Sequence, residues 1–423
     1  MQHTIAIEKM VDQIGPHAQL MASAVEACVH CGFCLVNCPT YQLLGEEMDS
    51  PRGRILLMKL ALEGDLSFQE TLPYIDRCLG CLACVPTCPS GVRYGDLVTP
   101  YKNYVHRLVK RSFMDNLQHT LIKQALPYPS RFRMAATLGK VAQPLKSFLP
   151  DDLRVMMTML PERLPPAKPL PAVMPAQGKR RARVALLVGC VQQVLEPDIN
   201  WATLRVLAKN GVEVVLPKDQ ACCGAVLLHS GDEEGARRLA LQNMRAFSDD
   251  YDAVLVNAAG CGAGIKDYEL LFKGQPEEAE AHALAQKARD VSVFLVELGI
   301  ETPPAWSKPV KIAYHDACHL ANAQGITEQP RKLLNLIPNV TLVNIPQAEF
   351  CCGSAGTYHI EQPELASEIG RRKVENILKT GGDMVVMGNI ACMVQIQQHL
   401  KQQGSPLPVY HTLQVLDLAY HTN

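Results

Sequence analysis

The sequence lacks several features that would place it in a common functional class. Its 423 residues carry a net charge of −1, so it has no basic excess of the kind expected for a general nucleic-acid binder. Only 5% of the residues are aromatic although 48% are hydrophobic, and the longest apolar stretches, such as Met384–Val394, are too short to span a bilayer. The N-terminus, MQHTIAIEKMVDQIG, has no apolar signal-peptide core. We expect a globular chain of two or three domains whose membrane contacts, if any, are peripheral.

Cysteine, in contrast, is abundant, with 16 residues. Without a signal peptide, so many thiols favour metal or redox chemistry over a disulfide framework. Eight of them form two copies of one spacing, which read Cys28-x2-Cys31-x2-Cys34-x3-Cys38-Pro39 and Cys78-x2-Cys81-x2-Cys84-x3-Cys88-Pro89.

This spacing is typical of proteins that hold two [4Fe–4S] clusters, because three close thiolates bind one cluster and the fourth binds the other. Two complete runs argue against zinc, since closed zinc sites usually show two separated cysteine pairs. The predicted ligands are Cys28, Cys31, Cys34 and Cys88 for the first cluster and Cys78, Cys81, Cys84 and Cys38 for the second.

The cysteine runs define an N-terminal domain, which we expect to be a helical two-cluster ferredoxin domain over residues 18–100. Residues 54–62 predict a helix that Gly64 closes. A helical connector and a proline-rich linker are expected over 101–182. Helical periodicity indicates one long helix over 96–126, whose basic face is either solvated or contacts a membrane or a partner.

Arg52 and Arg54 lie between the two runs. A cluster with four thiolates carries negative charge, so guanidinium groups nearby would favour its reduced form and raise its potential. Cations at the start of a helix oppose the helix dipole. This cost makes a specific role for the two arginines as credible as an ordinary structural one.

An internal repeat organises the rest of the chain into residues 183–300 and 308–423. Strands are predicted at 184–188, 212–216 and 253–256 in the first copy and at 311–314, 340–345 and 384–387 in the second. Helices alternate with these strands, which predicts α/β units with parallel sheets. The fold class is therefore α+β multidomain, with a helical ferredoxin domain followed by two repeated α/β domains.

The remaining eight cysteines occupy matching places in the two copies. We expect thiols at the carboxyl edge of a parallel sheet to meet in space. They predict a metal or redox site, either a further cluster, a zinc ion or a redox-active thiol pair, and buried packing cysteines are the alternative. The residues are Cys190, Cys222, Cys223 and Cys261 in the first copy and Cys318, Cys351, Cys352 and Cys392 in the second.

His315 and His319 flank Cys318. Three roles remain open for them at this point. The two histidines could be metal ligands, proton donors to a bound quinone, or residues that start a helix.

At this point the motifs resemble a known family. The runs ACVHCGFC, CPTYQLLG and SPRGRI, together with CPSGVRY at 88–94, resemble the iron–sulfur subunit of glycolate oxidase (glycolate dehydrogenase). The repeated units are similar to the cysteine-rich "CCG" domains of heterodisulfide reductases and of the anaerobic glycerol-3-phosphate dehydrogenase iron–sulfur subunit. The resemblance covers nearly the whole chain.

The resemblance implies an electron carrier within an oxidoreductase complex. Separate subunits would carry the flavin, expected to be FAD, and oxidise the 2-hydroxy acid, while this chain would pass electrons towards quinone. The absence of a G-x-G-x-x-G run opening a βαβ unit agrees with a flavin held elsewhere. We expect no catalytic residue in this chain, no nucleic-acid partner, and a location in the cytoplasm or peripherally on the inner face of the cytoplasmic membrane.

Two alternatives stay open. The CCG domains could reduce a disulfide, as in heterodisulfide reductases, or serve a glycerol-3-phosphate or lactate dehydrogenase; the chain could also be a scaffold that anchors flavin subunits. The longer CCG pattern ends in C-x-x-C, but here Gly264 and Gln395 occupy the last position. This departure argues against five-thiolate clusters and leaves four cysteines in each copy.

Overall fold

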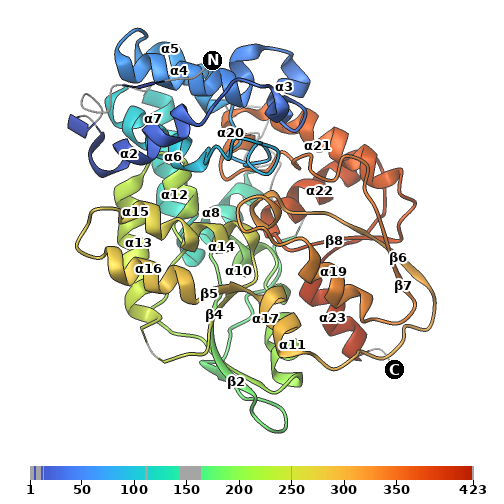
Figure 1. The fold of residues 1–423 in the computed structure, drawn as a ribbon. Helices are drawn as coiled ribbons and strands as arrows, with labels where there is room; N and C mark the ends of the chain where they lie inside the picture. Colours follow the sequence, from blue (N-terminus) through green and yellow to red (C-terminus); the bar gives the residue numbers. More distant parts are fainter. Residues whose placement is uncertain are drawn as a thin grey trace.

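The structure is a computed structural model that describes residues 4–5, 11–12, 14–109, 113–142, 163–248 and 250–421. A helical N-terminal domain, blue and cyan in Figure 1, lies across the top of two α/β units that sit side by side beneath it. Among the described helices, none combines the length and apolar character needed to cross a bilayer.

The N-terminal part consists of helices joined by loops that carry the cysteine runs. Its helices are α2 (Ala18–Glu26), α3 (Pro39–Leu44), α4 (Pro51–Glu63), α5 (Phe68–Asp76), α6 (Gly95–Leu108), α7 (Phe113–Ala125) and α8 (Pro129–Val141). Helix α4 begins where the Ser50 hydroxyl accepts the Gly53 N–H and ends at Gly64, whose φ is 89°. Only glycine adopts that conformation without strain, so the predicted end of this helix is confirmed.

The prediction of one long helix over 96–126 is wrong. Helix α6 ends at Leu108 because Val109 takes an extended backbone conformation, with φ −88° and ψ 128°, and α7 follows as a separate helix. The described part of the proline-rich linker contains one short strand, β1 (Val173–Met174). Residues 143–162 of the connector lie outside the described residues.

The first α/β unit is built around a five-stranded sheet with the order β1-β3-β2-β4-β5. Its further strands are β2 (Ala182–Leu187), β3 (Val212–Val215), β4 (Val254–Val256) and β5 (Ala288–Asp290). Its helices are α10 (Val191–Leu195), α11 (Asp198–Lys209), α12 (Ala225–His229), α13 (Glu233–Ala246), α14 (Ala259–Lys266), α15 (Tyr268–Leu271), α16 (Glu278–Lys287) and α17 (Val291–Leu298).

The second unit repeats this plan with a four-stranded sheet in the order β7-β6-β8-β9. Its strands are β6 (Val310–Tyr314), β7 (Val340–Val343), β8 (Met384–Met387) and β9 (Val409–His411). Its helices are α18 (Cys318–Ala321), α19 (Glu328–Asn335), α20 (Tyr358–Glu361), α21 (Pro363–Leu378), α22 (Ile390–Gln402) and α23 (Thr412–His421).

All strand pairs of the two sheets are parallel except that of β1 with β3. This confirms the predicted parallel sheets. Each copy also has a strand that the sequence pattern did not reveal, β5 in the first and β9 in the second. Both are three residues long, which is too short for a periodicity to be recognised.

The two α/β units share one core. A single hydrophobic cluster contains Leu186 and Leu204 of the first unit together with Ile312 and Leu416 of the second. The Arg205 guanidinium in α11 also donates three hydrogen bonds to the carboxylate of Asp417 in α23, of which the shortest is 2.6 Å. The repeats therefore pack as one body.

The N-terminal domain contacts both units. His106 in α6 lies 3.2 Å from the carbonyl of Ser230 in the first unit. In the second unit, the Tyr358 hydroxyl donates to the carbonyl of Arg77 at 3.0 Å, and the Asn322 amide donates to the carbonyl of Cys81 at 3.0 Å. The last contact joins a loop of the second cysteine run directly to the CCG repeat.

Candidate metal centres

The two cysteine runs fold into loops with the same backbone conformation. His30 and Gly80 each follow the first cysteine of a run by two positions and have φ of 55° and 63°. Gly32 and Leu82, two positions further along, have φ of 86° and 56°. These left-handed residues curl each loop around its cysteines and turn backbone N–H groups inward.

The curled loops place backbone donors on the sulfur atoms. The backbone of His30 hydrogen-bonds Cys28, and the backbone of Gly80 hydrogen-bonds Cys78 at the matching position of the second run. Burial raises the pKa of the Cys28 thiol, and the N–H donor opposes that rise because it favours the thiolate, which is the form that ligates metal.

Two adjacent cavities open between the loops. The first is lined by Cys28, Cys31, Cys34, Cys84 and Cys88. The second is lined by Cys38, Cys78, Cys81 and Cys84. Each cavity therefore receives three cysteines of one run together with the last cysteine of the other run, and Cys84 borders both.

The surroundings of the cavities suit an anionic metal cluster. Pro51, the first residue of α4, lines both cavities, so the positive end of this helix dipole faces them. All 16 cysteines are free thiols, and four of them converge on each space, which is the donor set that a [4Fe–4S] cluster requires. The residues present therefore fit two such clusters.

The two arginines between the runs reach different cavities. Arg52 lines the first cavity, donates to the carbonyl of His30 at 3.1 Å and pairs with Glu47 at 2.6 Å. A Cβ at Gly32 would lie 2.7 Å from the Arg52 guanidinium, so the glycine makes room for this contact.

Arg54 lies at the second cavity and is 1% exposed. Its guanidinium lies 3.9 Å from the Cys38 sulfur and 3.0 Å from the buried carboxylate of Asp49. Burial opposes ionisation of Cys78, but the positive charges of Arg54 and Lys102 more than offset burial and hold the pKa of this thiol below its usual value.

The other eight cysteines form one group in each α/β unit. In the first, the Cys222 and Cys190 sulfurs are 3.2 Å apart, and Cys223 hydrogen-bonds Cys261. In the second, Cys351 hydrogen-bonds Cys318, and Cys352 hydrogen-bonds Cys392. The expected meeting of thiols at the carboxyl edge of each sheet is what the structure has.

The glycine after each cysteine pair is required by the backbone. Gly224 and Gly353 have φ of 83° and 86°. A Cβ on Gly353 would approach the carbonyl oxygen of Ala366 in α21 to 2.6 Å, and a Cβ on Gly224 would approach that of Ala236 in α13 to 3.2 Å. Glycine lets each cysteine loop pack directly on α13 or α21.

The two histidines beside Cys318 have separate environments. His319 Nδ1 lies 3.4 Å from the Cys318 sulfur, and its ring faces that of His229 with the centroids 5.7 Å apart. His315 lies instead beside Cys352 and Cys392. Sequence reasoning named both histidines but could not tell which cysteines each would approach.

The second cavity adjoins the thiols of the second α/β unit. Cys81 packs against the hydrophobic cluster that contains Cys351, Cys352 and Cys392. Burial raises the pKa of Cys81 well above its usual value, and repulsion by Cys318 raises it further. The cysteines of the two kinds of domain thus form one continuous group on this side.

Comparison with known proteins agrees with this geometry. Residues 24–92 match the family model described as "4Fe-4S dicluster domain", and residues 184–266 and 312–397 match that described as "Cysteine-rich domain" (CCG). The "Glycolate oxidase iron-sulfur subunit" of Escherichia coli is 38% identical over 405 residues, which cover 94% of each chain. The chain belongs to the glycolate oxidase iron–sulfur subunit family.

Other members and relatives extend the likeness. The "Probable glycolate oxidase iron-sulfur subunit" of Bacillus subtilis is 37% identical over 89% of each chain. "Lactate utilization protein A" of Oceanobacillus iheyensis is 29% identical over 56% of this chain and 96% of its own length. Membership of this iron–sulfur subunit family supports iron–sulfur clusters in the N-terminal domain.

Proposed function

We propose that this chain is the electron-transfer subunit of a complex that oxidises glycolate or a similar 2-hydroxy acid. Partner subunits would carry the flavin and remove two electrons and two protons from the substrate. This chain would hold two [4Fe–4S] clusters and deliver the electrons towards quinone. The observation that carries the proposal is the convergence of four thiols from both runs on each of two adjacent cavities.

We assign the ligands by cavity. Cys28, Cys31, Cys34 and Cys88 would hold the first cluster, and Cys78, Cys81, Cys84 and Cys38 the second. A bound [4Fe–4S] cluster supplies one-electron transfer. The protein contributes the thiolates, the backbone N–H donors, and the charges of Arg52 and Arg54, which favour an additional electron beside them.

The position of the first cavity supports a partner that delivers electrons there. Cys31 is the exposed one among the 16 cysteines, all of which the structure describes. Around it, Val29, Phe33 and Val36 are 47%, 63% and 67% exposed. We name these three residues the Phe33 face and propose that the flavin-bearing subunit docks on it, because such a partner must bring its flavin close to the first cavity and would cover apolar side chains.

The second cavity, unlike the first, adjoins the CCG repeats. Asn322 holds the Cys81 loop against the second repeat. The proposed direction of electron transfer therefore runs from the Phe33 face, past Cys84, which both cavities share, towards the second repeat. We place the complex in the cytoplasm or on the inner face of its membrane, which cell fractionation would check.

Iron and sulfide analysis of anaerobically purified chain tests the proposal. Two clusters predict about eight irons and eight sulfides per chain, and co-purification should recover flavin-bearing subunits. Twelve or sixteen irons would place further clusters in the repeats. A preparation with zinc and no iron would overturn the proposal, and disulfide reductase activity of the isolated chain without a flavoprotein partner would favour a heterodisulfide-reductase-like role instead.

A further inference from the structure

His315 is an unusual buried histidine. It follows β6 directly and is 1% exposed. Neither of its ring nitrogens has a hydrogen-bond partner within the described residues. Buried polar atoms in folded proteins nearly always have a partner, so this imidazole has a nitrogen open to a ligand that the protein atoms do not supply.

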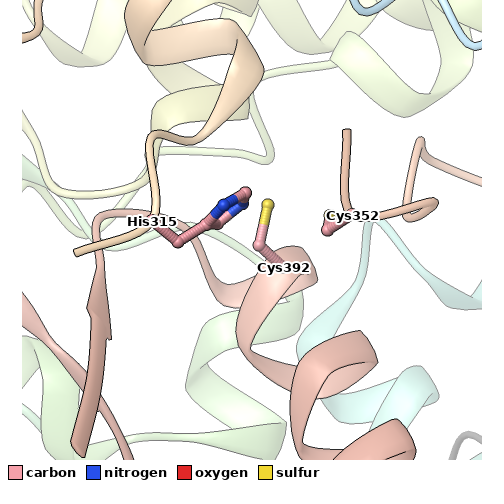
Figure 2. Close-up of side chains that lie close together, drawn as sticks. All are labelled: His315, Cys352 and Cys392. Atoms are coloured by element: carbon pink, nitrogen blue, oxygen red, sulfur yellow. The ribbon is translucent and has the colours of Figure 1, made fainter. Parts of the chain in front are cut away.

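The imidazole faces two thiols. The ligand atoms of His315, Cys352 and Cys392 all lie within 4.8 Å of one another, and all three residues are buried. Figure 2 shows the ring of His315 and the sulfur of Cys392 directed towards one another. The three side chains come from the loop after β6, the loop before α20 and the first turn of α22, so tertiary structure alone brings them together.

Further groups complete the surroundings of a metal ion. Cys351 hydrogen-bonds both Cys352 and Cys318, so a third thiol is within reach. The Asn389 amide donates to the Cys392 sulfur at 3.4 Å, as outer partners of metal ligands often do.

A buried cation also belongs to this site. Lys373 is 0% exposed, and its ammonium group donates to the carbonyls of Gln347 and Ala348. Its charge interacts favourably with the thiolate forms of Cys352 and Cys351. A buried ammonium would balance the net negative charge that three thiolates and one divalent cation create.

The first repeat provides an internal comparison. Ala185 pairs with Val215 in the first sheet as Ala313 pairs with Val343 in the second, and this alignment puts Leu187 at the position of His315. Gly224 contacts Ala236 as Gly353 contacts Ala366. This second alignment puts Asn243 at the position of Lys373. The first repeat thus has a leucine in place of the ligand and a neutral amide in place of the cation.

We propose that the second repeat binds one zinc ion and that the first does not. The imidazole of His315 and the thiolates of Cys352 and Cys392 supply three ligands, and Cys318 or Cys351 supplies the fourth. Imidazole and thiolate donors with no carboxylate in a closed, buried site are typical of structural zinc. Each thiol that binds releases its proton to solvent.

The test is metal analysis of the full chain purified without air. Wild-type chain should contain about one zinc beside about eight irons. His315→Ala and Cys392→Ser should lose the zinc and keep the iron. Cys261→Ser, which changes the counterpart of Cys392 in the first repeat, should keep both metals.

A ligand exchange guards against misfolding. His315→Cys should retain zinc because a thiolate can replace the imidazole. The zinc X-ray absorption spectrum should show nitrogen and sulfur neighbours in wild type and sulfur alone in His315→Cys.

Three results would overturn the proposal. They are wild-type chain without zinc, equal zinc loss in Cys261→Ser, and loss of iron instead of zinc in His315→Ala. The inference stands apart from the proposed function, since absence of zinc leaves the eight irons and the partner subunits untouched.

Discussion

The ferredoxin domain and the pair of CCG domains each carry eight cysteines but present them differently. In the ferredoxin domain the thiols line two cavities, and one of them, Cys31, is exposed. In the CCG domains the thiols contact one another, with Cys222 and Cys190 only 3.2 Å apart. The first arrangement leaves room for a large cofactor, and the second leaves room for a single ion or for none.

The difference arises from how far apart the cysteines lie in the sequence. Within each ferredoxin run, cysteines separated by two residues sit on one curled loop that borders a cavity. In each CCG domain an adjacent cysteine pair meets two cysteines from other loops at one sheet edge, where the sulfurs contact one another. Cysteines that repeat along one curled loop therefore border a cavity, whereas a cysteine pair that meets cysteines from other loops forms direct sulfur contacts.

The largest effect is expected when a cysteine that binds the other run's cluster is removed. Cys38→Ser removes one ligand of the second cluster, and the other three cysteines of its own run still bind the first cluster. Iron should therefore fall from about eight to about four per chain. Iron analysis and electron paramagnetic resonance of the reduced protein measure this. Cys31→Ser is the matched control and should affect the first cluster; the ligand assignment fails if Cys38→Ser removes the first cluster's signal alone.

Removing the buried carboxylate of Asp49 should destabilise the ferredoxin domain but not the CCG repeats. Asp49 pairs with Arg54 at 3.0 Å and Arg77 at 2.8 Å, and Asp49→Ala leaves the buried Arg54 guanidinium without its carboxylate partner. We expect a loss of about 3–5 kcal/mol, read as a lower thermal midpoint of the cluster absorbance.

Glu368→Ala removes an exposed partner of Arg371 and should cost at most about 1 kcal/mol. Equal effects of Asp49→Ala and Glu368→Ala would contradict the role of the buried network.

The exposed side of the ferredoxin domain can be tested through partner binding. Phe33→Asp should weaken binding of the flavin-bearing subunit about tenfold, which is about 1.4 kcal/mol, while the iron content stays the same. Surface plasmon resonance measures the affinity. Val173→Asp, at a 47% exposed apolar residue in β1, should leave it unchanged, and a similar loss in both variants would argue against the Phe33 face.

The smallest effect is expected between the repeats. Arg205 and Asp417 form a partly exposed ion pair, so Arg205→Ala should lower stability by about 1 kcal/mol. A double-mutant cycle with Asp417→Ala isolates the interaction. Additive single effects would show that this ion pair contributes no interaction energy to the contact between the repeats.

Much of the fold was predictable because the signals were local. Alternating strands and helices predicted both parallel sheets, and Gly64 predicted the end of α4. The split between α6 and α7 was not predictable, because helical periodicity continues on both sides of Val109. The short strands β5 and β9 depend on pairing with β4 and β8, which no local pattern encodes.

By itself, the sequence determined the two cysteine runs, their curled loops and the repeated CCG units. These follow from residue spacing and from Gly32 and Gly80, which take two of the four left-handed positions in the loops. Tertiary structure alone decided that Arg54 is buried beside Cys38 and that His315 meets Cys352 and Cys392. Such contacts join segments far apart in the chain, so their distances depend on how helices and sheets pack and not on spacing along the sequence.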